Sequence, residues 1–295
     1  MEEIIYHEKP LLHKPCLIIG FEGWPNAAEV SSTALQHLIK TTEAKKFATL
    51  RSEHFYQTSL ARPVGIIKEG RLVELRFGEN HFYYSKELSP VDLIFFQGIE
   101  PHLRWDVFAE VLLSVADKYE VSRLFTIGGT YDYIPHTYPP RVSALFNHES
   151  LKEDIVERGI SLTEYTGPIS IHTFILEAAR KRGLKGVSLW GHAPQYLQAR
   201  NVKVVHAVLK KLNDLLEMDI DLSDLRQAGE YFDQQINQLM EQDPKLQEVI
   251  GKLEDVYKES EKLPLSSGEE RAKEEKVVYL QAFFKKPGDE EKKGG

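Results

Sequence analysis

The chain has 295 residues, a hydrophobic share of 42% and a formal net charge of -8. That hydrophobic share excludes wholesale disorder, and the length suits one large domain or two ordinary ones. An acidic surface repels nucleic acid and anionic lipid. We therefore expect a globular protein that binds neither nucleic acid nor membranes.

The single cysteine indicates the compartment. Cys16 lies in an apolar run at residues 16–19 and cannot form an internal disulfide, which fits a reducing environment. A thiol in a buried strand is a poor nucleophile. The first residues lack a signal-peptide pattern, and no apolar run approaches the ~18 residues of a membrane helix. The sequence predicts a cytoplasmic protein with Cys16 in its core.

Strand and helix patterns alternate along the first two thirds of the chain. Strands are expected at residues 16–21, 47–50, 92–97, 124–127 and 186–190, and helices at residues 27–40, 105–118, 149–158, 171–182 and 202–216. Asn26 is the expected N-cap of the first helix. This alternation predicts an α/β fold with a mostly parallel sheet and helices on both faces.

An antiparallel stretch interrupts the alternation. Residues 64–67 and 72–77 flank the turn Glu69-Gly70, and a further strand is expected at residues 81–84. No domain boundary stands out before the end of the last helix. We interpret residues 1–218 as one α/β core domain with an inserted antiparallel hairpin.

The C-terminal part has a different character. Residues 219–261 carry two apolar stripes at helical spacing, separated at Pro244, and predict an amphipathic helical hairpin. This helical extension either packs back on its own domain or docks on another subunit or partner. Residues 262–295 are expected to be a flexible linker, a short apolar island at residues 277–284 and a charged tail.

Motifs for catalysis are missing from the sequence. It has no Gly-rich phosphate loop, no helical histidine pair for a metal and no hydrolase serine elbow. Asp132 and His136 lie close in sequence, but without a placed nucleophile we interpret them as structural. We therefore expect no catalytic residues, no metal and no cofactor.

Three unusual segments follow predicted strands, at residues 20–28, 128–141 and 189–196. Because the carboxyl ends of parallel strands share one rim of a sheet, these segments should meet there. Arg141 would hold an anionic group, His192 would exchange a proton, and Trp24 and Tyr196 would stack on a ring. The candidate ligand-binding residues at this rim are Glu22, Gly23, Trp24, Asn26, Gly129, Arg141, His192 and Tyr196.

The same three segments resemble the proteasome assembly chaperone 2 family, over about residues 15–215. Three motifs carry the resemblance. They are Gly23-Trp24-Pro25-Asn26-Ala27-Ala28, then Gly128-Gly129 with Pro135-His136-Thr137 and Arg141-Val142, and last Tyr165-Thr166-Gly167-Pro168 with Ser188-Leu189-Trp190-Gly191-His192-Ala193-Pro194-Gln195-Tyr196. The resemblance implies a nucleoside-phosphorylase-like α/β sandwich that is often a homo-oligomer, and we expect a trimer here. Members that act on proteasomes end in a hydrophobic-Tyr-any tail, whose nearest counterpart here is Val278-Tyr279-Leu280. Ala28 stands where the family often has glycine.

Two functions remain open from the sequence. The first is a non-enzymatic assembly chaperone or scaffold that associates with itself and with an unidentified protein partner, such as proteasome subunits. The second is a small-molecule binding protein or enzyme that takes a nucleoside or a phosphorylated metabolite at the rim.

Overall fold

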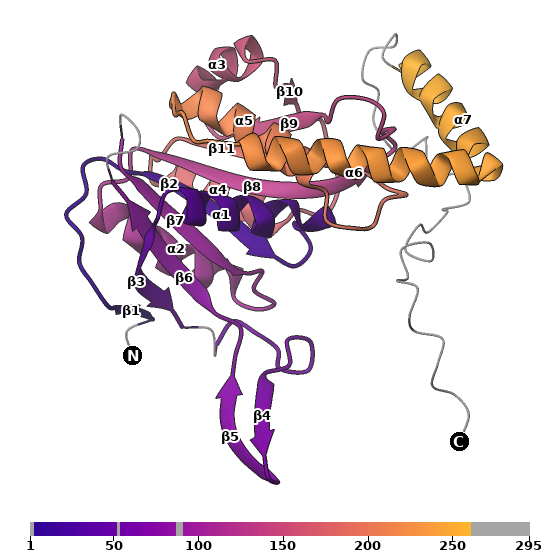
Figure 1. Cartoon of the computed structure of the whole chain (residues 1–295). Helices are drawn as coiled ribbons and strands as arrows, with labels where there is room; N and C mark the ends of the chain where they lie inside the picture. Colours follow the sequence, from indigo (N-terminus) through magenta and orange to yellow (C-terminus); the bar gives the residue numbers. More distant parts are fainter. Residues whose placement is uncertain (1–2, 52–53, 87–90, 261–295) are drawn as a thin grey trace.

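The computed structural model describes residues 3–51, 54–86 and 91–260 (Figure 1). A mixed sheet in the order β1-β3-β6-β7-β2-β8-β11-β9-β10 forms its centre. Its strands are β1 (Ile4–Tyr6), β2 (Cys16–Glu22), β3 (Lys45–Leu50), β6 (Asn80–Ser85), β7 (Leu93–Ile99), β8 (Arg123–Asp132), β9 (Val142–Phe146), β10 (Ser161–Leu162) and β11 (Gly186–Pro194). The central strands β7, β2, β8 and β11 are parallel, whereas β6 and β9 flank them antiparallel.

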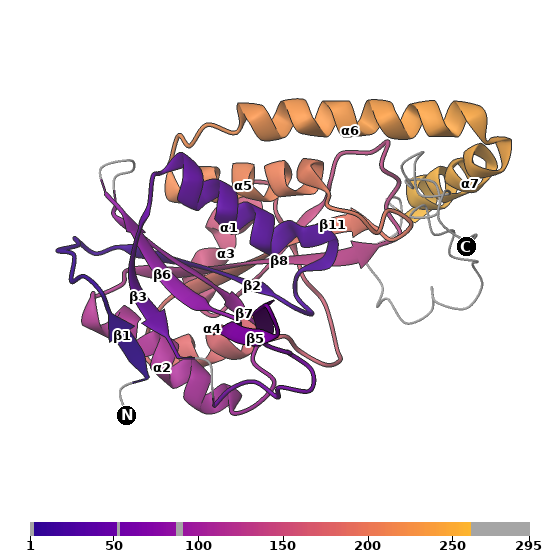
Figure 2. The same ribbon diagram turned by 60° about the horizontal axis from the view of Figure 1, so that its bottom comes forward.

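Helices cover both faces of the sheet, as predicted (Figure 2). One face packs against α1 (Val30–Thr41), α3 (Lys152–Glu157) and α5 (Val202–Leu216), and the other against α2 (Trp105–Lys118) and α4 (Ile171–Lys181). In β2, Ile18 faces the first group of helices, while Leu17 and Ile19 face the second. The continuous apolar run of β2 therefore arises because both of its faces are buried.

The predicted hairpin is a separate two-stranded sheet of β4 (Val64–Lys68) and β5 (Arg71–Arg76), which we call the arm. It projects from the body of the molecule (Figure 1). Glu69 and Gly70 both have positive φ, 49° and 78°, as the turn types that join twisted antiparallel strands require. After the arm the chain returns to the central sheet as β6.

The C-terminal extension is helical, as predicted, and packs on its own chain. Helix α6 (Ser223–Gln242) lies along α5, and α7 (Pro244–Ser260) begins at Pro244 (Figure 2). Leu225 of α6 joins the core beneath α5, and Ile236 contacts a small cluster with Leu197 and Ile250. Residues 261–295, which include the predicted linker, apolar island and tail, lie outside the described residues.

Several predicted boundaries were wrong. The helix expected at residues 27–40 begins with a separate 3-10 turn, Ala27–Glu29, because Ala28 and Glu29 have positive φ. Likewise, a 3-10 turn, Glu149–Leu151, precedes α3. Strands β8 and β11 extend several residues beyond the predictions, and β1, β9 and β10 were not predicted.

None of the described helices is long and apolar enough to cross a membrane.

Candidate functional site

The three predicted segments lie at the carboxyl ends of the parallel strands. Strand β2 ends at Glu22, β8 at Asp132 and β11 at Pro194, and the register of the ladder brings Pro194 opposite Asp132. Because β8 and β11 extend through Gly129 and His192, these two residues lie in strands rather than in loops.

A half-buried carboxylate holds the turn after β2. Glu100, just beyond β7, accepts hydrogen bonds from the backbone N–H of Trp24 and of Ile171, each at 3.1 Å. Burial raises the pKa of Glu100, while these two N–H groups oppose that rise. The contact joins the turn to the start of α4 and leaves the Trp24 side chain 62% exposed. Gly23, with φ of 115°, permits the turn, and Glu22 next to it is exposed.

Asn26 and Gly129 have structural contacts. Asn26 Oδ1 accepts from the backbone N–H of Ser32 at 3.0 Å, so Asn26 does satisfy a free N–H of α1, although the helix starts later than predicted. Asn26 and Gly129 form a parallel β-bridge. A Cβ at Gly129 would lie 2.3 Å from the carbonyl oxygen of Ala27, so only glycine allows this close approach.

Arg141 and His192 are brought together in a hydrogen-bonded network on strand ends. His192 Nδ1 lies 2.9 Å from Asp132 Oδ2, and His192 Nε2 lies 2.8 Å from Ser143 Oγ. Arg141 pairs with Asp132 and lies 3.0 Å from His192 Nδ1. Thr163 donates to Ser143 Oγ at 3.1 Å. In one proton arrangement Ser143 donates to His192 Nε2 and His192 Nδ1–H donates to Asp132. Arg141, which can only donate, then bonds to Asp132 and lies beside His192 Nδ1 without a hydrogen bond to it.

The electrostatics of this network favour a neutral imidazole beside an ion pair. Burial lowers the pKa of His192, although the hydrogen bond to Asp132 opposes this effect. Burial alone would raise the pKa of Asp132, but the hydrogen bond from His192 and the charge of Arg141 hold it below its ordinary value. At neutral pH, Asp132 is therefore a carboxylate that orients both Arg141 and His192.

The network contains the three residue types of a serine hydrolase triad, but here the serine is buried and the aspartate is partly exposed. A catalytic serine must meet substrate, while its aspartate is buried. Here Ser143 is only 5% exposed, whereas the side chains of Asp132 and Arg141 are 25% and 33% exposed. The end that can meet a ligand is therefore the guanidinium–carboxylate pair. This arrangement suits ion pairing and not nucleophilic attack.

Tyr196 belongs to a different set of contacts. Its hydroxyl lies 2.7 Å from His136 Nδ1 and accepts from the His136 backbone N–H, also at 2.7 Å. Burial raises the pKa of Tyr196 and lowers that of His136. Lys203 of α5 donates to the His136 carbonyl and to Asp233 of α6, both at 2.7 Å. Tyr196 also packs against the cluster of Leu197, Ile236 and Ile250, so it contacts the C-terminal helices.

The sequence missed three members of the network, Asp132, Ser143 and Thr163. Asp132 was paired with His136 in our interpretation, but it contacts His192, which is 60 positions away in the chain. Ser143 lies in β9, whose antiparallel register against β11 places it opposite Trp190. The pairing of β9 with β11 joins residues that are far apart in the chain, and no local sequence pattern indicates it. These contacts could therefore not be predicted from the sequence.

Comparison with known proteins identifies the family. The PAC2 family profile matches residues 20–240, which cover both the rim and most of α6. The chain belongs to the PAC2 family. The resemblance inferred from the three motifs is thereby confirmed. The comparison with curated proteins finds no match.

Solved PAC2 structures share the fold. A PAC2 family protein from Streptomyces avermitilis is 29% identical, with a TM-score of 0.70 over 76% of this chain and 95% of that one. A proteasome-assembly chaperone homologue from Mycobacterium tuberculosis is 27% identical, with a TM-score of 0.72 over 79% and 98%. An archaeal proteasome activator from Pyrococcus furiosus is 25% identical, with a TM-score of 0.64 over 81% and 99%.

Proposed function

We propose that this PAC2 protein is a non-enzymatic assembly chaperone that works by protein association, as a homo-oligomer and with proteasome components as partners. The observation that carries the proposal is the similarity to a proteasome-assembly chaperone homologue over 98% of that protein's length. The inverted exposure of the Ser143–His192–Asp132 network agrees with a non-enzymatic role, because its serine is sealed from substrate.

The distribution of exposed apolar side chains supports association at the rim. Most of the large apolar side chains that are exposed in the described residues lie on the arm or next to the carboxyl ends of the central strands. Those near the strand ends are Trp24, Leu103, Tyr131, Tyr133, Tyr165 and Ile169. Exposed apolar groups gathered in this way are typical of a protein-binding surface.

The test is reconstitution with purified proteasome subunits from the source organism. We expect the full chain to bind α- or β-subunits and to raise the rate at which the core particle assembles on native gels. Trp24→Ala should weaken binding by about tenfold or more, since exposed tryptophans are frequent hot spots. Val156→Ala, at an exposed position of α3, is the matched control. Neither binding nor a changed assembly rate with the wild type would contradict the proposal.

One observation favours a second candidate, an anion-binding role at Arg141. Asp132 orients the guanidinium, and Arg141 Nε is buried with no hydrogen-bond partner among the described residues. A carboxylate or phosphate could pair with this group. Thermal shift with inorganic phosphate and with nucleoside monophosphates tests it. We expect a stabilisation that Arg141→Gln abolishes, and equal shifts for both proteins would remove this candidate.

A further inference from the structure

Helix α7 lies over part of the rim. Thr137, in the segment that follows β8, donates to Glu254 of α7 at 2.5 Å, and the ring centroids of Tyr138 and Tyr257 lie 5.0 Å apart. In both ribbon views α7 lies beyond the carboxyl ends of β8 and β11 (Figures 1 and 2). The helix is therefore on the same side of the molecule as the exposed apolar side chains of the proposed binding surface.

The apolar surface of the rim continues beneath α7. Tyr131 and Tyr133 are each 38% exposed, and a few residues later in the same segment Tyr138 lies against α7. Leu197, which follows β11, is only 1% exposed, because it packs in the small cluster that contains Ile250 of α7. Movement of α7 away from this position would therefore enlarge the apolar surface that the rim offers to a partner.

The docking of α7 depends on few apolar groups. In this helix Ile250 and Leu253 are buried, whereas Val249 and Val256 are 41% and 51% exposed. The cluster that holds Ile250 has three buried side chains and is separate from the two large cores of the body. A helix with so small a buried face can open locally while the rest of the protein stays folded. Helix α6 remains on α5 in such an opening, because Leu225 joins the main core.

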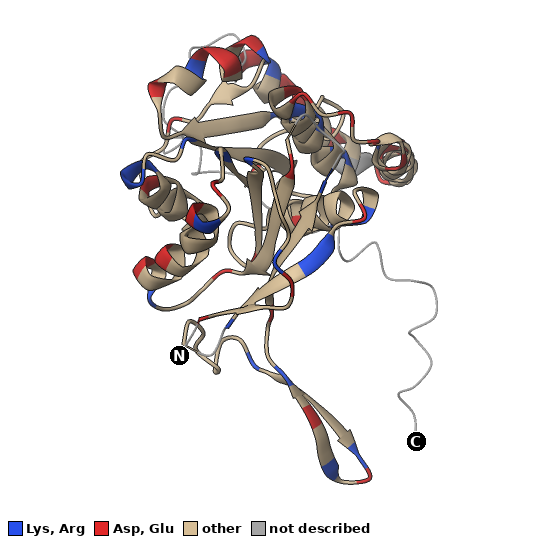
Figure 3. Cartoon of the chain, turned by 90° about the vertical axis from the view of Figure 1, so that its left-hand side faces the viewer, with Lys and Arg blue, Asp and Glu red and all other residues tan. Residues whose placement is uncertain are grey.

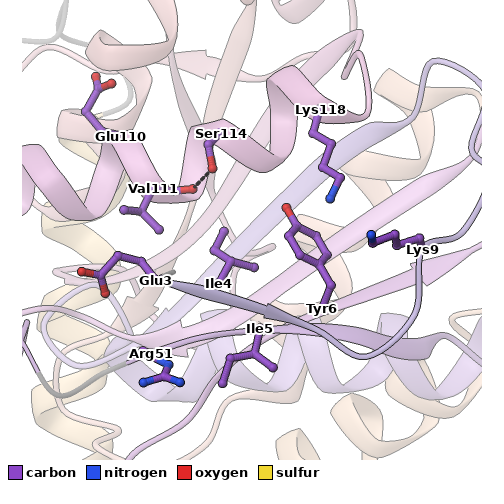
Figure 4. A pocket seen from close by; sticks show the side chains of 10 residues that line it. All are labelled: Glu3, Ile4, Ile5, Tyr6, Lys9, Arg51, Glu110, Val111, Ser114 and Lys118. Carbon is purple, nitrogen blue, oxygen red and sulfur yellow. Dashed lines mark hydrogen bonds between the residues drawn. The ribbon is translucent and has the colours of Figure 1, made fainter. Parts of the chain in front are cut away.

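The arm and the largest groove lie elsewhere. The arm projects away from the body (Figures 1 and 3). A groove of about 1010 Å³ lies between β1 and α2 (Figure 4), and β1 is separated from β8 by β3, β6, β7 and β2. Of the two extensions, the C-terminal one therefore covers the rim, and the groove is a remote place for a control.

We propose that α7 is an autoinhibitory cover, which must leave the rim before a protein partner binds there. This inference rests on the proposed function and adds its regulation. Asp243, in an extended conformation, is the single residue between α6 and α7 and serves as the hinge. The PAC2 match ends at residue 240, so the cover lies beyond the part of the chain that the family profile matches. While α7 is docked, the apparent affinity for a partner is reduced in proportion to the fraction of molecules that are open.

An opened variant tests the cover with the proteasome subunits of the reconstitution. Ile250→Glu with Leu253→Glu places two carboxylates on the buried face of α7 in the full chain. We expect the amides of α7 to lose hydrogen-exchange protection relative to β2. Subunit binding should tighten by about tenfold if α7 is docked in about nine-tenths of the wild-type molecules. Val249→Glu with Val256→Glu adds the same charge to the exposed face of α7 and is the matched control, which should change neither quantity.

A locked variant tests the opposite direction. Thr137→Cys with Glu254→Cys, joined by a short reducible bis-maleimide, fastens α7 to the rim. Cys16 is fully buried and burial raises the pKa of its thiol, so the introduced cysteines are the ones that react. We expect the locked chain to bind subunits at least about tenfold more weakly than the wild type, and reduction to restore binding. Glu110→Cys with Ser114→Cys, cross-linked within α2 beside the groove of Figure 4, is the matched control and should bind as the wild type does.

The outcomes separate the cover from the proposed function. Tighter binding by the opened chain, with weaker binding by the locked chain, supports the cover. If subunits bind the wild type but the locked chain binds them equally before and after reduction, the cover is wrong and the proposed partner stands. Unchanged binding by an opened chain whose α7 has lost its protection overturns the cover in the same way. If no subunit binds even the opened chain, the proposed proteasome partner is wrong, and its regulation by α7 is overturned with it.

Discussion

The arm and the C-terminal helices both extend from the α/β body, but only the helices return to it. The stripe of α6 and α7 is buried through Leu225, Ile236 and Ile250, whereas the arm leaves its apolar residues in solvent. The two extensions are similar in sequence character, since each alternates apolar and charged residues. The apolar faces of α6 and α7 are therefore part of the folded core, whereas the apolar side chains of the arm are free to contact a partner.

The largest expected difference between the two regions is in stability. Ile236 is fully buried, so Ile236→Ala should lower the free energy of unfolding by about 2–5 kcal/mol. Ile67→Ala, at a position that is 68% exposed, should change it by less than about 0.5 kcal/mol at high dilution. Urea unfolding followed by circular dichroism measures both. Equal losses of unfolding free energy in the two variants would contradict this distinction, because the arm would then be part of the folded core.

A smaller effect is expected where Lys203 connects the rim to α6. Lys203→Met removes the bonds to Asp233 and to the His136 carbonyl, and it keeps the apolar stem of the side chain. Both charged groups are partly exposed, so we expect a loss of about 1–2 kcal/mol rather than the cost of a fully buried pair. The same unfolding measurement applies, with Lys210→Met, at an exposed position of α5, as control.

The contact of the helices with the rim should also depend on pH. Burial lowers the pKa of His136, with Lys203 acting in the same direction and Asn237, Asp233 and Glu254 acting against it. Because the folded pKa lies below the unfolded value of about 6.5, the stabilisation is present above that pH and is lost as the pH falls through the folded pKa.

Hydrogen exchange measures this dependence on pH. Amides of α6 and α7 should lose protection below about pH 6.5 relative to those of β2, after correction for intrinsic rates. Amides of the arm should show no such change relative to β2, because His136 does not contact the arm. His136→Phe should flatten the pH dependence in α6 and α7. An unchanged dependence in this variant would assign the effect to another group.

Sequence patterns predicted the parts of the fold that depend on local periodicity. The buried run of β2, the turn Glu69-Gly70 and the break at Pro244 each have a short-range cause, and each is found in the structure. Local pattern could not anticipate β9, whose five residues pair antiparallel with β11 in an otherwise parallel region.

The candidate site was predicted in part, for the same reason. Arg141 and His192 do lie together, because Arg141 immediately precedes β9, and β9 pairs with β11. Asp132, which orients them, could be assigned only from the register between β8 and β11. Trp24 and Tyr196 were expected to stack on one ligand, yet Trp24 is fixed near Glu100 and Tyr196 contacts His136. A binding role for the rim residues stays a prediction.

The most direct test of the account is the mass of the protein in solution, measured by sedimentation velocity. One chain has a mass of 33.8 kDa. We predict a species of several times that mass for the wild type, because the proposed function is that of a homo-oligomer. A wild type that sediments as one chain at every concentration would contradict the proposed homo-oligomer.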